Sequence, residues 1–437
     1  MILMTRSKFL IAATSSGCGK TTLSLGLMRA FAVRGMTVQP FKCGPDYIDT
    51  QFHAEATGRT SINLDTFMAS ENHVRTVFDR YSSRADVSIV EGVMGMLDGY
   101  ERMKGSSADI ARLLDIPIIL LVNAASTAYS VAATIYGFTR FVPDVRVAGV
   151  IFNRVGSESH FSFLREACAD AGVDCLGYIR RNDSLVTPSR HLGLTLGARE
   201  EMERYITNAA KAVSDGVDLE KLLKVTEVTD RPAENGTAIR SSRTKLRIAV
   251  ARDEAFNFIY EENLRNLLTS PRYDVEVTYF SPLNDARLPE ADFVYLPGGY
   301  PELYADGLEA NTSMRRSVRE YAESGGKMLG ECGGMIYLSE EIDGKKMCGV
   351  LPLTVSMNNA RLTLGYRTAE INSMVFRGHE FHYSKVADDS RAEKILSRQT
   401  NVRGREVATP VYRYKNVLAG YTHLYWAESD ILKLFGL

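Results

Sequence analysis

Short apolar, β-branched runs alternate with amphipathic segments through the first half of the chain. The runs predict strands at residues 8–13, 38–41, 87–90, 118–122, 147–152 and 175–179, with helical segments between them. This alternation is typical of an α/β fold with a mostly parallel sheet that is covered on both faces. In such a sheet ligands bind at the carboxyl ends of the strands, so we expect the functional residues there.

The alternation stops at residues 224–245 and then begins again. This segment is polar, contains Pro and Gly, and shows no helix or strand periodicity, which is typical of a linker. Beyond it, apolar runs predict strands at 246–251, 275–280, 293–296 and 327–330, and a helix at 260–268. We therefore predict two α/β domains, at residues 1–223 and 246–437, joined by a linker at residues 224–245.

Length, charge and cysteine content narrow the class of protein. A chain of 437 residues exceeds the size of one ordinary core, which supports two domains. The net charge of -1 with 24% charged residues argues against a nucleic-acid partner. No apolar run is long enough to span a bilayer and the first residues do not resemble a secretory signal, so we expect a cytoplasmic protein with no membrane partner. The six cysteines include no C-x-x-C pair, and we expect reduced thiols.

Residues 14–22, with the sequence TSSGCGKTT, follow the first predicted strand and precede a helical run. A glycine-rich loop between a strand and a helix turns backbone N–H groups toward a phosphate. In the motif G-x-x-x-x-G-K-[ST], the lysine reaches the β- and γ-phosphates and the hydroxyl binds Mg²⁺. Thr14 replaces the first glycine of this motif. The expected nucleotide-binding residues are Gly17, Gly19, Lys20, Thr21 and Thr22.

Acidic side chains follow two of the other predicted strands. The stretch FKCGPDYIDT places Asp46 and Asp49 just beyond the strand at 38–41, where they can bind Mg²⁺, orient a substrate or cap a helix. Glu91 follows the strand at 87–90, the position from which a P-loop fold holds Mg²⁺ or its waters. The glycines after Glu91 allow a loop to present Asp98 to a ligand, or to form a structural turn.

Two polar segments after later strands are less specific. Asn153 follows the strand at 147–152, where its amide can read the edge of an adenine or form a turn. Arg190 and His191 lie in a polar loop after the strand at 175–179, where they can meet a carboxylate-rich ligand or be solvated.

The second half carries a candidate cysteine nucleophile. Cys332 stands between a short strand and a helical run and is followed by two glycines, which is the pattern of a sharp elbow that exposes the sulfur. We expect the N-terminus of that helix to lower the pKa of the thiol. Gly298 and Gly299 follow another strand, so their N–H groups and that of Gly333 can form an oxyanion hole.

A cysteine nucleophile needs a base, and His423 is the candidate. Taken alone, such a histidine is more often a hydrogen-bonded core residue, but Cys332 and the glycine turn in the same domain favour catalysis. His379 and His382 form the other concentration of histidine. Without a clear third ligand they indicate contacts to an acidic substrate or a structural network more than a metal site.

Together these motifs resemble one family, the glutamine-dependent cobyrinic acid a,c-diamide synthases of cobalamin biosynthesis. The resemblance covers nearly the whole chain and rests on ordered motifs at residues 14–22, 42–49, 91–99, 297–302, 331–335, 378–383 and 421–424. It implies a P-loop, parallel-sheet ATP-dependent amide synthase domain followed by a flavodoxin-like class I glutamine amidotransferase domain. The implied partners are a corrinoid polycarboxylate, ATP and L-glutamine, with Mg²⁺ as the cofactor. A homodimer is compatible with the sequence, which does not determine the oligomeric state.

The resemblance also implies roles for individual residues. Cys332 is the implied glutaminase nucleophile and His423 its base. The implied Mg²⁺ ligands are Thr21, Glu91 and Asp46. The residues implied in substrate activation are Asp46, Asp49 and Asp98. Ordinary triad glutaminases have a Glu two residues after the histidine, but Tyr425 occupies that position here. The synthase family is similar in lacking this Glu, so its absence fits the resemblance. Which group orients His423 stays open.

Several alternatives stay open. The same a,c-diamidation could act on hydrogenobyrinic acid or nickel-sirohydrochlorin, because these motifs do not distinguish the macrocycles. A cobyric acid synthase, which amidates other side chains, fits the stretch KCGPDY less well. A P-loop switch ATPase with an appended binding module and no amide synthesis would have no use for Cys332 on an elbow beside an oxyanion turn.

Overall fold

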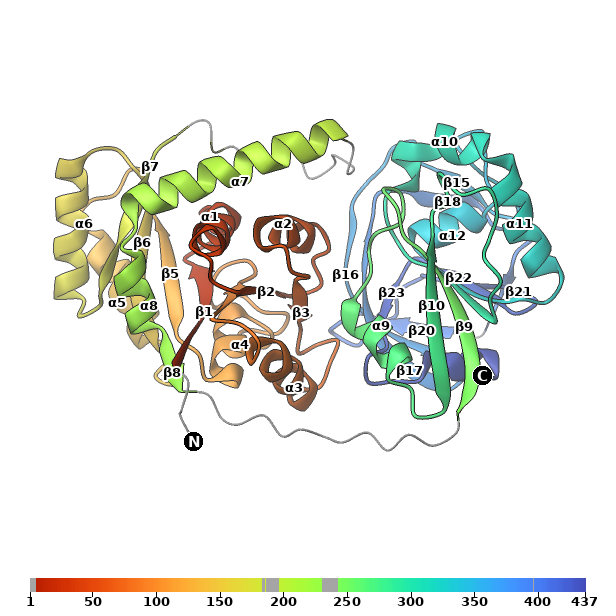
Figure 1. Ribbon diagram of the computed structural model, residues 1–437, viewed down its shortest axis with the longest axis horizontal. Coiled ribbons are helices and arrows are strands. Elements are labelled where there is room, and N and C mark those ends of the chain that lie inside the picture. Colours follow the sequence, from red (N-terminus) through yellow and green to blue (C-terminus); the bar gives the residue numbers. More distant parts are fainter. Residues whose placement is uncertain (1–4, 183–184, 186–195, 230–242, 396) are drawn as a thin grey trace. The chain divides into compact units, whose positions relative to one another are not determined.

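The computed structural model describes residues 5–182, 185, 196–229, 243–395 and 397–437 (Figure 1). The chain forms two compact units, Met1–Thr237 and Ala238–Leu437. The candidate residues Arg190 and His191, and the larger part of the predicted linker, lie outside the described residues. In the part of the chain that is described, no helix is both long enough and apolar enough to cross a bilayer.

The first unit is built on a sheet with the strand order β3-β2-β4-β1-β5-β6-β7. Its strands are β1 (Thr5–Ala13), β2 (Val38–Cys43), β3 (Ile62–Leu64), β4 (Val87–Glu91), β5 (Ile118–Asn123), β6 (Val147–Val155) and β7 (Cys175–Arg180). All neighbours in this order are parallel, so their carboxyl ends share one edge. The six predicted strands are confirmed. β3 escapes the sequence pattern because a strand of 3 residues is too short to show a period.

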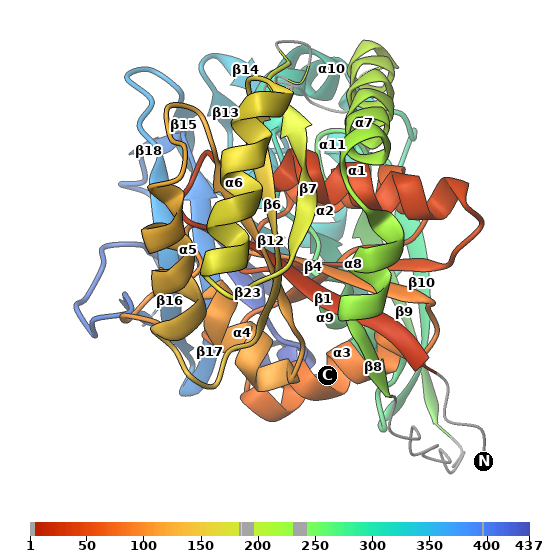
Figure 2. The ribbon, with the colours of Figure 1, turned by 90° about the vertical axis from the view of Figure 1, so that its left-hand side faces the viewer.

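Helices cover both faces of this sheet. They are α1 (Lys20–Val33), α2 (Ile48–Thr57), α3 (Glu71–Ser82), α4 (Ser107–Leu114), α5 (Val131–Arg140), α6 (Glu158–Asp170), α7 (Leu196–Gly216) and α8 (Leu219–Val225). Figure 1 shows α1 and α2 on one side of the middle strands and α3 and α4 on the other. Figure 2 shows α5 and α6 on the side of the sheet opposite α7 and α8. Because both faces are covered, β1 is apolar and fully buried from Phe9 to Ala13.

Part of the segment predicted as a linker is ordered in the first unit. Residues 227–229 form β8 (Glu227–Thr229), which pairs antiparallel with the start of β1. β5 pairs with β1 only from Leu10 onward, which leaves the backbone groups at the start of β1 without a partner from β5. β8 pairs with some of these groups, and the carbonyl of Thr226 accepts from the backbone N–H of Lys8. The sequence predicts a linker here because a strand of 3 residues is too short to show a periodic pattern.

The second unit has its own central sheet, in the order β10-β9-β11-β12-β22-β21-β19. Its strands are β9 (Thr244–Ala251), β10 (Tyr273–Phe280), β11 (Phe293–Leu296), β12 (Lys327–Glu331), β19 (Glu393–Lys394), β21 (Val411–Tyr414) and β22 (Val417–Gly420). The pairs from β10 to β22 are parallel, while β21 and β19 are antiparallel additions at the edge. The helical segments are α9 (Glu261–Leu268), α10 (Ala305–Ala310), α11 (Thr312–Glu323), α12 (Gly333–Leu338), η1 (Pro301–Tyr304) and η2 (Ile431–Phe435). The strands predicted at 246–251, 275–280, 293–296 and 327–330 are confirmed.

Two smaller sheets complete the second unit, with the orders β14-β13-β15-β18 and β20-β16-β17-β23. Their strands are β13 (Glu341–Ile342), β14 (Lys345–Lys346), β15 (Thr354–Ser356), β16 (Thr363–Ile371), β17 (Met374–His382), β18 (Lys385–Asp388), β20 (Ser397–Thr400) and β23 (His423–Tyr425). β16 and β17 form a hairpin through Asn372 and Ser373, whose φ angles are 49° and 64°. Two residues with positive φ are typical of a type I′ turn, but Ser373 stands here in place of the glycine that usually marks it.

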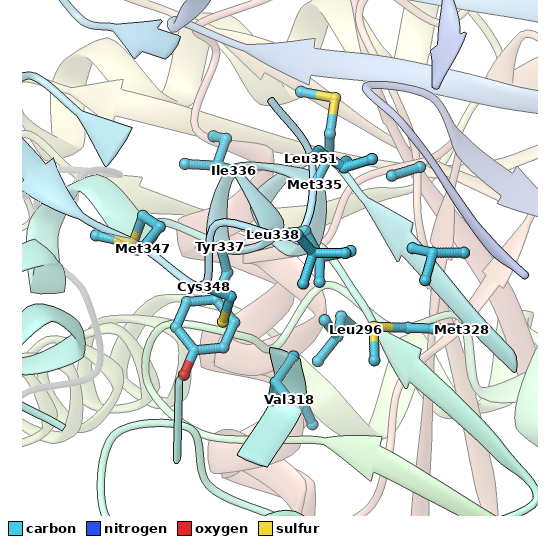
Figure 3. Close-up of a cluster of buried hydrophobic side chains, with 14 of the residues drawn as sticks. Leu296, Val318, Met328, Met335, Ile336, Tyr337, Leu338, Met347, Cys348 and Leu351 are labelled. Carbon is cyan, nitrogen blue, oxygen red and sulfur yellow. The ribbon is translucent and has the colours of Figure 1, made fainter. Parts of the chain in front are cut away.

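A methionine-rich core fixes the helix that follows Cys332. Every residue of α12 is buried, and Met335 and Leu338 pack with Leu296 of β11 and Met328 of β12 (Figure 3). Unbranched methionine side chains fill irregular gaps of this kind. The elbow between β12 and α12 is therefore held by a packed core on its inner side.

Gly26 allows α1 and α7 to approach closely, and its substitution tests this packing. A Cβ atom added at Gly26 would lie 2.7 Å from the carbonyl oxygen of Ala209 and 2.5 Å from Cγ2 of Val213. We expect Gly26→Ala to lower the free energy of unfolding by about 1–3 kcal/mol, because overpacking outweighs the gain in helix propensity. Urea denaturation followed by circular dichroism measures the change.

Gly137→Ala is the matched control for this substitution. Gly137 lies within α5, and an added Cβ atom there would meet nothing within 4 Å. The control is expected to stabilise the protein by up to about 1 kcal/mol. Equal effects of the two substitutions would contradict the packing argument.

Candidate active sites

The glycine-rich loop at residues 14–19 joins β1 to α1. Gly17 and Gly19 have φ angles of 76° and 97°, in the left-handed region that favours glycine. Gly19 is also crowded, because an added Cβ atom would lie 2.3 Å from Nδ2 of Asn153. α1 begins directly after the loop, at Lys20. The strand, loop and helix therefore follow one another in the order that phosphate binding requires.

A cleft of about 910 Å³ opens at the carboxyl ends of these parallel strands. Among the residues that line it are the candidates Gly17, Gly19, Lys20, Thr21, Thr22, Asp46, Asp49, Glu91 and Asn153. Asp98 is not among the lining residues. It is exposed, and its carboxylate accepts a hydrogen bond from the backbone N–H of Gly95 at 3.0 Å. The structure thus brings the predicted nucleotide, metal and substrate candidates of the first unit together, with the exception of Asp98.

Lys42 is the centre of a buried cluster of charges beside this cleft. Its Nζ atom lies 2.7 Å from Oδ2 of Asp49 and 2.9 Å from Oε1 of Glu91. No side chain of the three is more than 5% exposed. A buried ammonium group is costly unless it is paired, so the two carboxylates are what allows Lys42 to be charged in this position.

The groups of this cluster do not share the charge equally. Burial by itself lowers the pKa of Lys42, but Asp49 and Glu91 raise it above its ordinary value. Burial by itself raises the pKa of Glu91, but Lys42 and a hydrogen bond with His53 bring it well below its ordinary value. For Asp49, burial outweighs the attraction of Lys42 and raises the pKa to about 6. One ammonium group cannot compensate two carboxylates fully, and Glu91 has the additional hydrogen-bond donors.

The last residues of the glycine-rich loop have different partners. The hydroxyl of Thr21 donates to Oε1 of Glu91 at 2.8 Å, so two of the candidate metal ligands are in contact. The ammonium group of Lys20 donates to the carbonyl of Met94, and its pKa is lowered by burial and by the charge of Lys42. Thr22 is buried, and its hydroxyl lies 2.7 Å from the hydroxyl of Tyr205, which ties the start of α1 to α7.

Asp46 forms the helix-capping contact that the sequence left open as an alternative, whereas Asn153 makes a long-range contact that the sequence did not predict. Oδ1 of Asp46 accepts hydrogen bonds from the backbone N–H groups of Ile48 at 2.8 Å and Asp49 at 2.9 Å, which caps the start of α2. Nδ2 of Asn153 donates to the carbonyl of Cys18 at 2.8 Å. Both residues also line the cleft, so their binding roles stay predictions.

Two residues of this site have no role in the sequence-based prediction. His53 is fully buried, and its Nε2 atom lies 2.8 Å from Oε2 of Glu91. The available signal is the spacing of four residues between Asp49 and His53, which places both on one face of a helix. Arg154 has a φ of 59° and its guanidinium donates to the carbonyl of Gly17 at 3.2 Å. A left-handed arginine cannot be recognised from a single sequence.

In the second unit, Cys332 joins β12 to α12 at a sharp turn. Its φ and ψ angles are 47° and -101°, a conformation that a residue with a side chain adopts only under constraint. Its backbone N–H donates to the carbonyl of Gly420, at the end of the neighbouring strand β22, at 2.8 Å. The predicted elbow is present, but the expected exposure of its sulfur is not, since Cys332 is only 2% exposed. The thiol instead donates to the carbonyl of Phe381 at 3.8 Å.

Gly298, Gly333 and His423 meet around one turn after β11. A Cβ atom at Gly298 would lie 2.1 Å from Cε1 of His423. A Cβ atom at Gly333 would lie 2.9 Å from the backbone nitrogen of Gly299. The ring of His423 therefore packs on this turn, and the residue after Cys332 packs on it as well. The structure thus gathers the candidate nucleophile, the candidate base and the three oxyanion candidates at the carboxyl ends of β11, β12 and β22.

Burial keeps both catalytic candidates of this site in their neutral forms. It raises the pKa of the Cys332 thiol, and the charge of Glu302 adds to this effect. The hydrogen bond from the backbone N–H of Gly333 acts in the expected lowering direction but is outweighed, so the expectation of a lowered thiol pKa is wrong. Burial also lowers the pKa of His423 to about 3, with further contributions from His379 and His382. A neutral imidazole is the form that can accept a proton.

Hydrogen bonds on both sides of His423 hold the strand that carries it. The carboxyl group of Glu331 accepts from the backbone N–H of Leu424 at 3.0 Å and from the hydroxyl of Tyr295 at 2.7 Å. On the other side, the hydroxyl of Thr422 donates to the side-chain oxygen of Gln399 at 2.8 Å. Glu331 immediately precedes Cys332, so one buried side chain connects the elbow to the strand of the histidine.

The position that holds a Glu in ordinary triad glutaminases has a packing role here. Tyr425 is buried, and its ring makes an edge contact with the ring of Tyr260. His423 lies directly opposite His379 in the pairing of β23 with β17. Strand pairing therefore sets the position of His423.

His379 and His382 belong to a packed network. The ring of His382 stacks on Tyr421 with 3.7 Å between the ring centroids, and its Nδ1 atom lies 2.8 Å from the carbonyl oxygen of Ser384. The ring of His379 makes an edge contact with Tyr366. Among the described residues, no group of three or more His, Cys, Asp and Glu side chains is arranged to hold a metal ion.

The fold and the two sites define a class of protein with a nucleotide-binding domain and a glutamine amidotransferase domain on one chain. Residues 9–194 match the CobQ/CobB/MinD/ParA nucleotide binding domain, and residues 247–431 match the CobB/CobQ-like glutamine amidotransferase domain.

Full-length relatives narrow this class to one family. A cobyrinate a,c-diamide synthase of Picrophilus torridus is 39% identical over 97% of this chain and 96% of its own length. The enzyme of the same name from Listeria innocua is 38% identical over 98% and 99%. That from Syntrophotalea carbinolica is 40% identical over 97% and 96%. The chain belongs to the cobyrinate a,c-diamide synthase family and is a glutamine-dependent, amide-forming ligase.

Gly298→Ala tests whether the glycine turn and His423 form one site. The added Cβ would displace the imidazole ring, and a displacement of about 1 Å at a reacting group can reduce the rate about 100-fold. We expect glutamine hydrolysis to fall by about that factor while amide synthesis with ammonium chloride continues. Gly307→Ala, where the nearest atom is a flexible leucine methyl at 3.3 Å, serves as the control. Unchanged glutamine hydrolysis in Gly298→Ala would contradict the packing of His423 on the turn.

The buried carboxyl of Glu331 predicts a pH dependence of stability. Burial raises its pKa from 4.5 to about 8, so between these values the folded protein keeps a proton that the unfolded chain releases. The free energy of unfolding therefore falls as the pH rises through this window, by on the order of 1 kcal/mol per pH unit. In Glu331→Gln the side chain keeps its shape but can no longer gain or lose a proton. The free energy of unfolding of this variant, relative to that of the unsubstituted protein, should therefore rise from pH 5 to pH 8 with about this slope.

Urea denaturation of the full chain measures this effect in the second unit alone. Trp426 is the one tryptophan of the sequence and is fully buried against Tyr295, so its fluorescence reports on this unit. Glu276→Gln, on the exposed side of β10, is the control and should show no such trend. Parallel pH profiles for Glu331→Gln and the unsubstituted protein would contradict the assignment.

Proposed function

We propose that the protein uses ATP and glutamine to convert the a and c side-chain carboxylates of cobyrinic acid to amides. The observation that carries this proposal is the presence on one chain of two different sites. One is a phosphate-loop cleft that contains Lys20, Thr21 and Glu91, and the other is a Cys332 elbow packed on a Gly-Gly turn with His423. The full-length relatives of this name support the choice of substrate.

The first site provides what activation of a carboxylate requires. A carboxylate is a poor electrophile toward ammonia, so ATP first converts it to an acyl phosphate with a good leaving group, and the transfer needs positive charge between two anions. The loop from Gly17 to Thr22 would hold the phosphates, and Lys20, whose pKa is lowered where it stands, gains a strong partner when an anion arrives. Asn153 would contact the base of the nucleotide from the wall of the cleft.

The acidic candidates fall into separate roles. Asp46 lines the cleft and would face the substrate, while Asp49 would act through its ion pair with Lys42. Asp98, outside the cleft lining, would act only through the loop that it holds at Gly95. We infer that Lys42 offsets the charge of Asp49 and Glu91, so that a polyanionic substrate and ATP can occupy the same cleft.

Mg²⁺ fits the donor set of this site. Mg²⁺ is usually held by one or two carboxylates together with substrate phosphates, and the contacting oxygens of Thr21 and Glu91, with Asp46 nearby in the lining, are hard donors of this type. Bound there, the ion would neutralise charge on the transferring phosphoryl group. The contact between the Thr21 hydroxyl and Glu91 is what this chain contributes to that site.

The second site would release ammonia from glutamine. Because both partners are neutral at rest, proton transfer from the Cys332 thiol to His423 would accompany attack of the sulfur on the carboxamide carbon. A thioester forms as the C–N bond breaks, the proton passes to the leaving nitrogen, and water then hydrolyses the thioester. Backbone N–H groups of Gly298, Gly299 and Gly333 would stabilise the oxyanion.

The decisive experiment combines substrate, cofactor and labelled donor. Purified protein is incubated with cobyrinic acid, Mg-ATP and amide-¹⁵N-glutamine, and product mass and ADP are followed. We expect two labelled nitrogens per ring, with ADP formed in step. Glutamine hydrolysis without amidation would overturn cobyrinic acid as the substrate, and hydrogenobyrinic acid and nickel-sirohydrochlorin are the next rings to supply.

Cys332→Ser separates the two half-reactions in the same assay. The variant should lose labelled nitrogen transfer and glutamine hydrolysis, while ammonium chloride restores amidation. Persistent glutamine hydrolysis would show that Cys332 is not the nucleophile. ATP hydrolysis that never leads to an amide, with either nitrogen donor and with each ring, would favour a P-loop switch ATPase.

A further inference from the structure

His53 and Ser61 form a second layer of contacts behind Glu91. Nε2 of His53 lies 2.8 Å from Oε2 of Glu91, and Nδ1 of the same ring lies 3.0 Å from the hydroxyl oxygen of Ser61. His53 is fully buried and Ser61 is 5% exposed. Both ring nitrogens are thus engaged in a region from which water is excluded.

The two oxygens of Glu91 are divided between two sets of partners. Oε1 faces the cleft side, where it contacts the hydroxyl of Thr21 at 2.8 Å and the ammonium group of Lys42 at 2.9 Å. Oε2 faces away, toward His53. This division fixes the rotation of the carboxylate about its last bond, and that rotation decides which oxygen is presented to Thr21.

Helix α2 provides the contact because of its residue spacing. Asp49 and His53 are four residues apart in α2, so they lie on one face of the helix. Asp49 reaches Lys42 of β2, and His53 reaches Glu91 of β4. The helix that is capped by Asp46 is thus attached at two points to the strands that carry the charged cluster.

Lys42, the buried ammonium group on the other oxygen of Glu91, cannot take over the contact of His53. Lys42 is already shared between Asp49, Glu91 and the carbonyl of Gly92. A buried carboxylate oxygen that loses its donor carries a large desolvation cost, so the group would rotate or take up a proton instead. Either change moves Oε1 from Thr21 or removes its charge.

We propose that His53, held in place by Ser61, is a positioning residue for the ATP-dependent half-reaction. It donates its Nε2 hydrogen to Glu91 while Nδ1 accepts from the hydroxyl of Ser61, and this pair of bonds keeps Oε1 of Glu91 on Thr21. The inference rests on the proposed function, in which Thr21 and Glu91 hold the ion that accompanies ATP. Residues behind a metal ligand typically change metal affinity or activity about 10- to 100-fold when they are removed.

The test measures ATP-dependent amidation with ammonium chloride as the nitrogen donor, so that the second site does not contribute. ADP formation is recorded as a function of Mg²⁺ concentration for His53→Ala, His53→Gln and Ser61→Ala. His53→Ala should lower kcat, or raise the Mg²⁺ concentration at half-maximal rate, by about 10- to 100-fold. The KM for the ring substrate should change much less, because His53 is not among the residues that line the cleft.

His53→Gln provides the rescue that a purely structural role does not predict. The Nε2 atom of glutamine lies the same number of bonds from Cα as Nε2 of histidine and can donate to Glu91. We expect this variant to recover most of the lost rate, and Ser61→Ala to show a smaller defect of the same kind. A His53→Gln variant as impaired as His53→Ala, at equal thermal stability, would overturn the proposal.

Two controls separate failure of this inference from failure of the proposed function. His160→Ala removes another histidine whose ring nitrogens are both engaged, but with backbone partners away from Glu91, and it should leave the Mg²⁺ profile unchanged. Glu91→Gln should abolish ADP formation. If Glu91→Gln is inactive while His53→Ala keeps its rate and Mg²⁺ dependence within twofold, the positioning role is wrong and the proposed function stands. If Glu91→Gln is fully active, the role given to Glu91 is wrong and the positioning role of His53 is wrong with it. Absence of both ADP formation and amidation in the unsubstituted protein would instead contradict the proposed function.

Discussion

The first site depends on one buried ammonium group. Lys42 sits at the end of β2, within hydrogen-bond distance of Asp49 from α2 and Glu91 from β4. Lys42 can be buried in its charged form only while both carboxylates are paired with it, because an unpaired buried charge would destabilise the folded protein by roughly several kcal/mol. The same interaction therefore fixes three elements relative to each other, and through α2 it also fixes His53.

In the second site, close contacts take the place of charge. Gly298 lies against the imidazole of His423, Gly333 lies against Gly299, and an added Cβ at Gly334 would lie 2.0 Å from the carbonyl oxygen of Leu296. Both catalytic candidates are buried and neutral in the resting protein. Charged ligands can therefore change the ion pairs of the first site. In the second site, binding depends on how the ligand fits the packed turn, and the chemistry depends on proton transfer between Cys332 and His423.

Most of the fold was predictable because the central strands are continuous apolar runs. The strands at 87–90 and 118–122 are buried on both faces, so every residue in them is apolar or small and the pattern is plain. The strands that were not predicted are β3, β8, the three central-sheet strands β19, β21 and β22, and the two small sheets of the second unit. They are short or half-exposed, and β23 exists because residues 423–425 pair with β17, a partner about 45 residues away in the sequence.

The sequence by itself determined the chemistry at the ends of the strands. Lys20 and Thr21 follow β1 after the loop at residues 14–19, Glu91 ends β4, and Cys332 directly follows β12. Parallel strands bring such residues to one edge of their sheet whatever the details of the fold. Only the tertiary structure decided how they are held and charged. The pKa directions of Asp49 and Cys332, the exclusion of Asp98 from the cleft lining, and the contact of His53 with Glu91 depend on burial and on distances of about 3 Å between residues far apart in the chain. Spacing along the sequence carries no information about desolvation, and desolvation sets these properties.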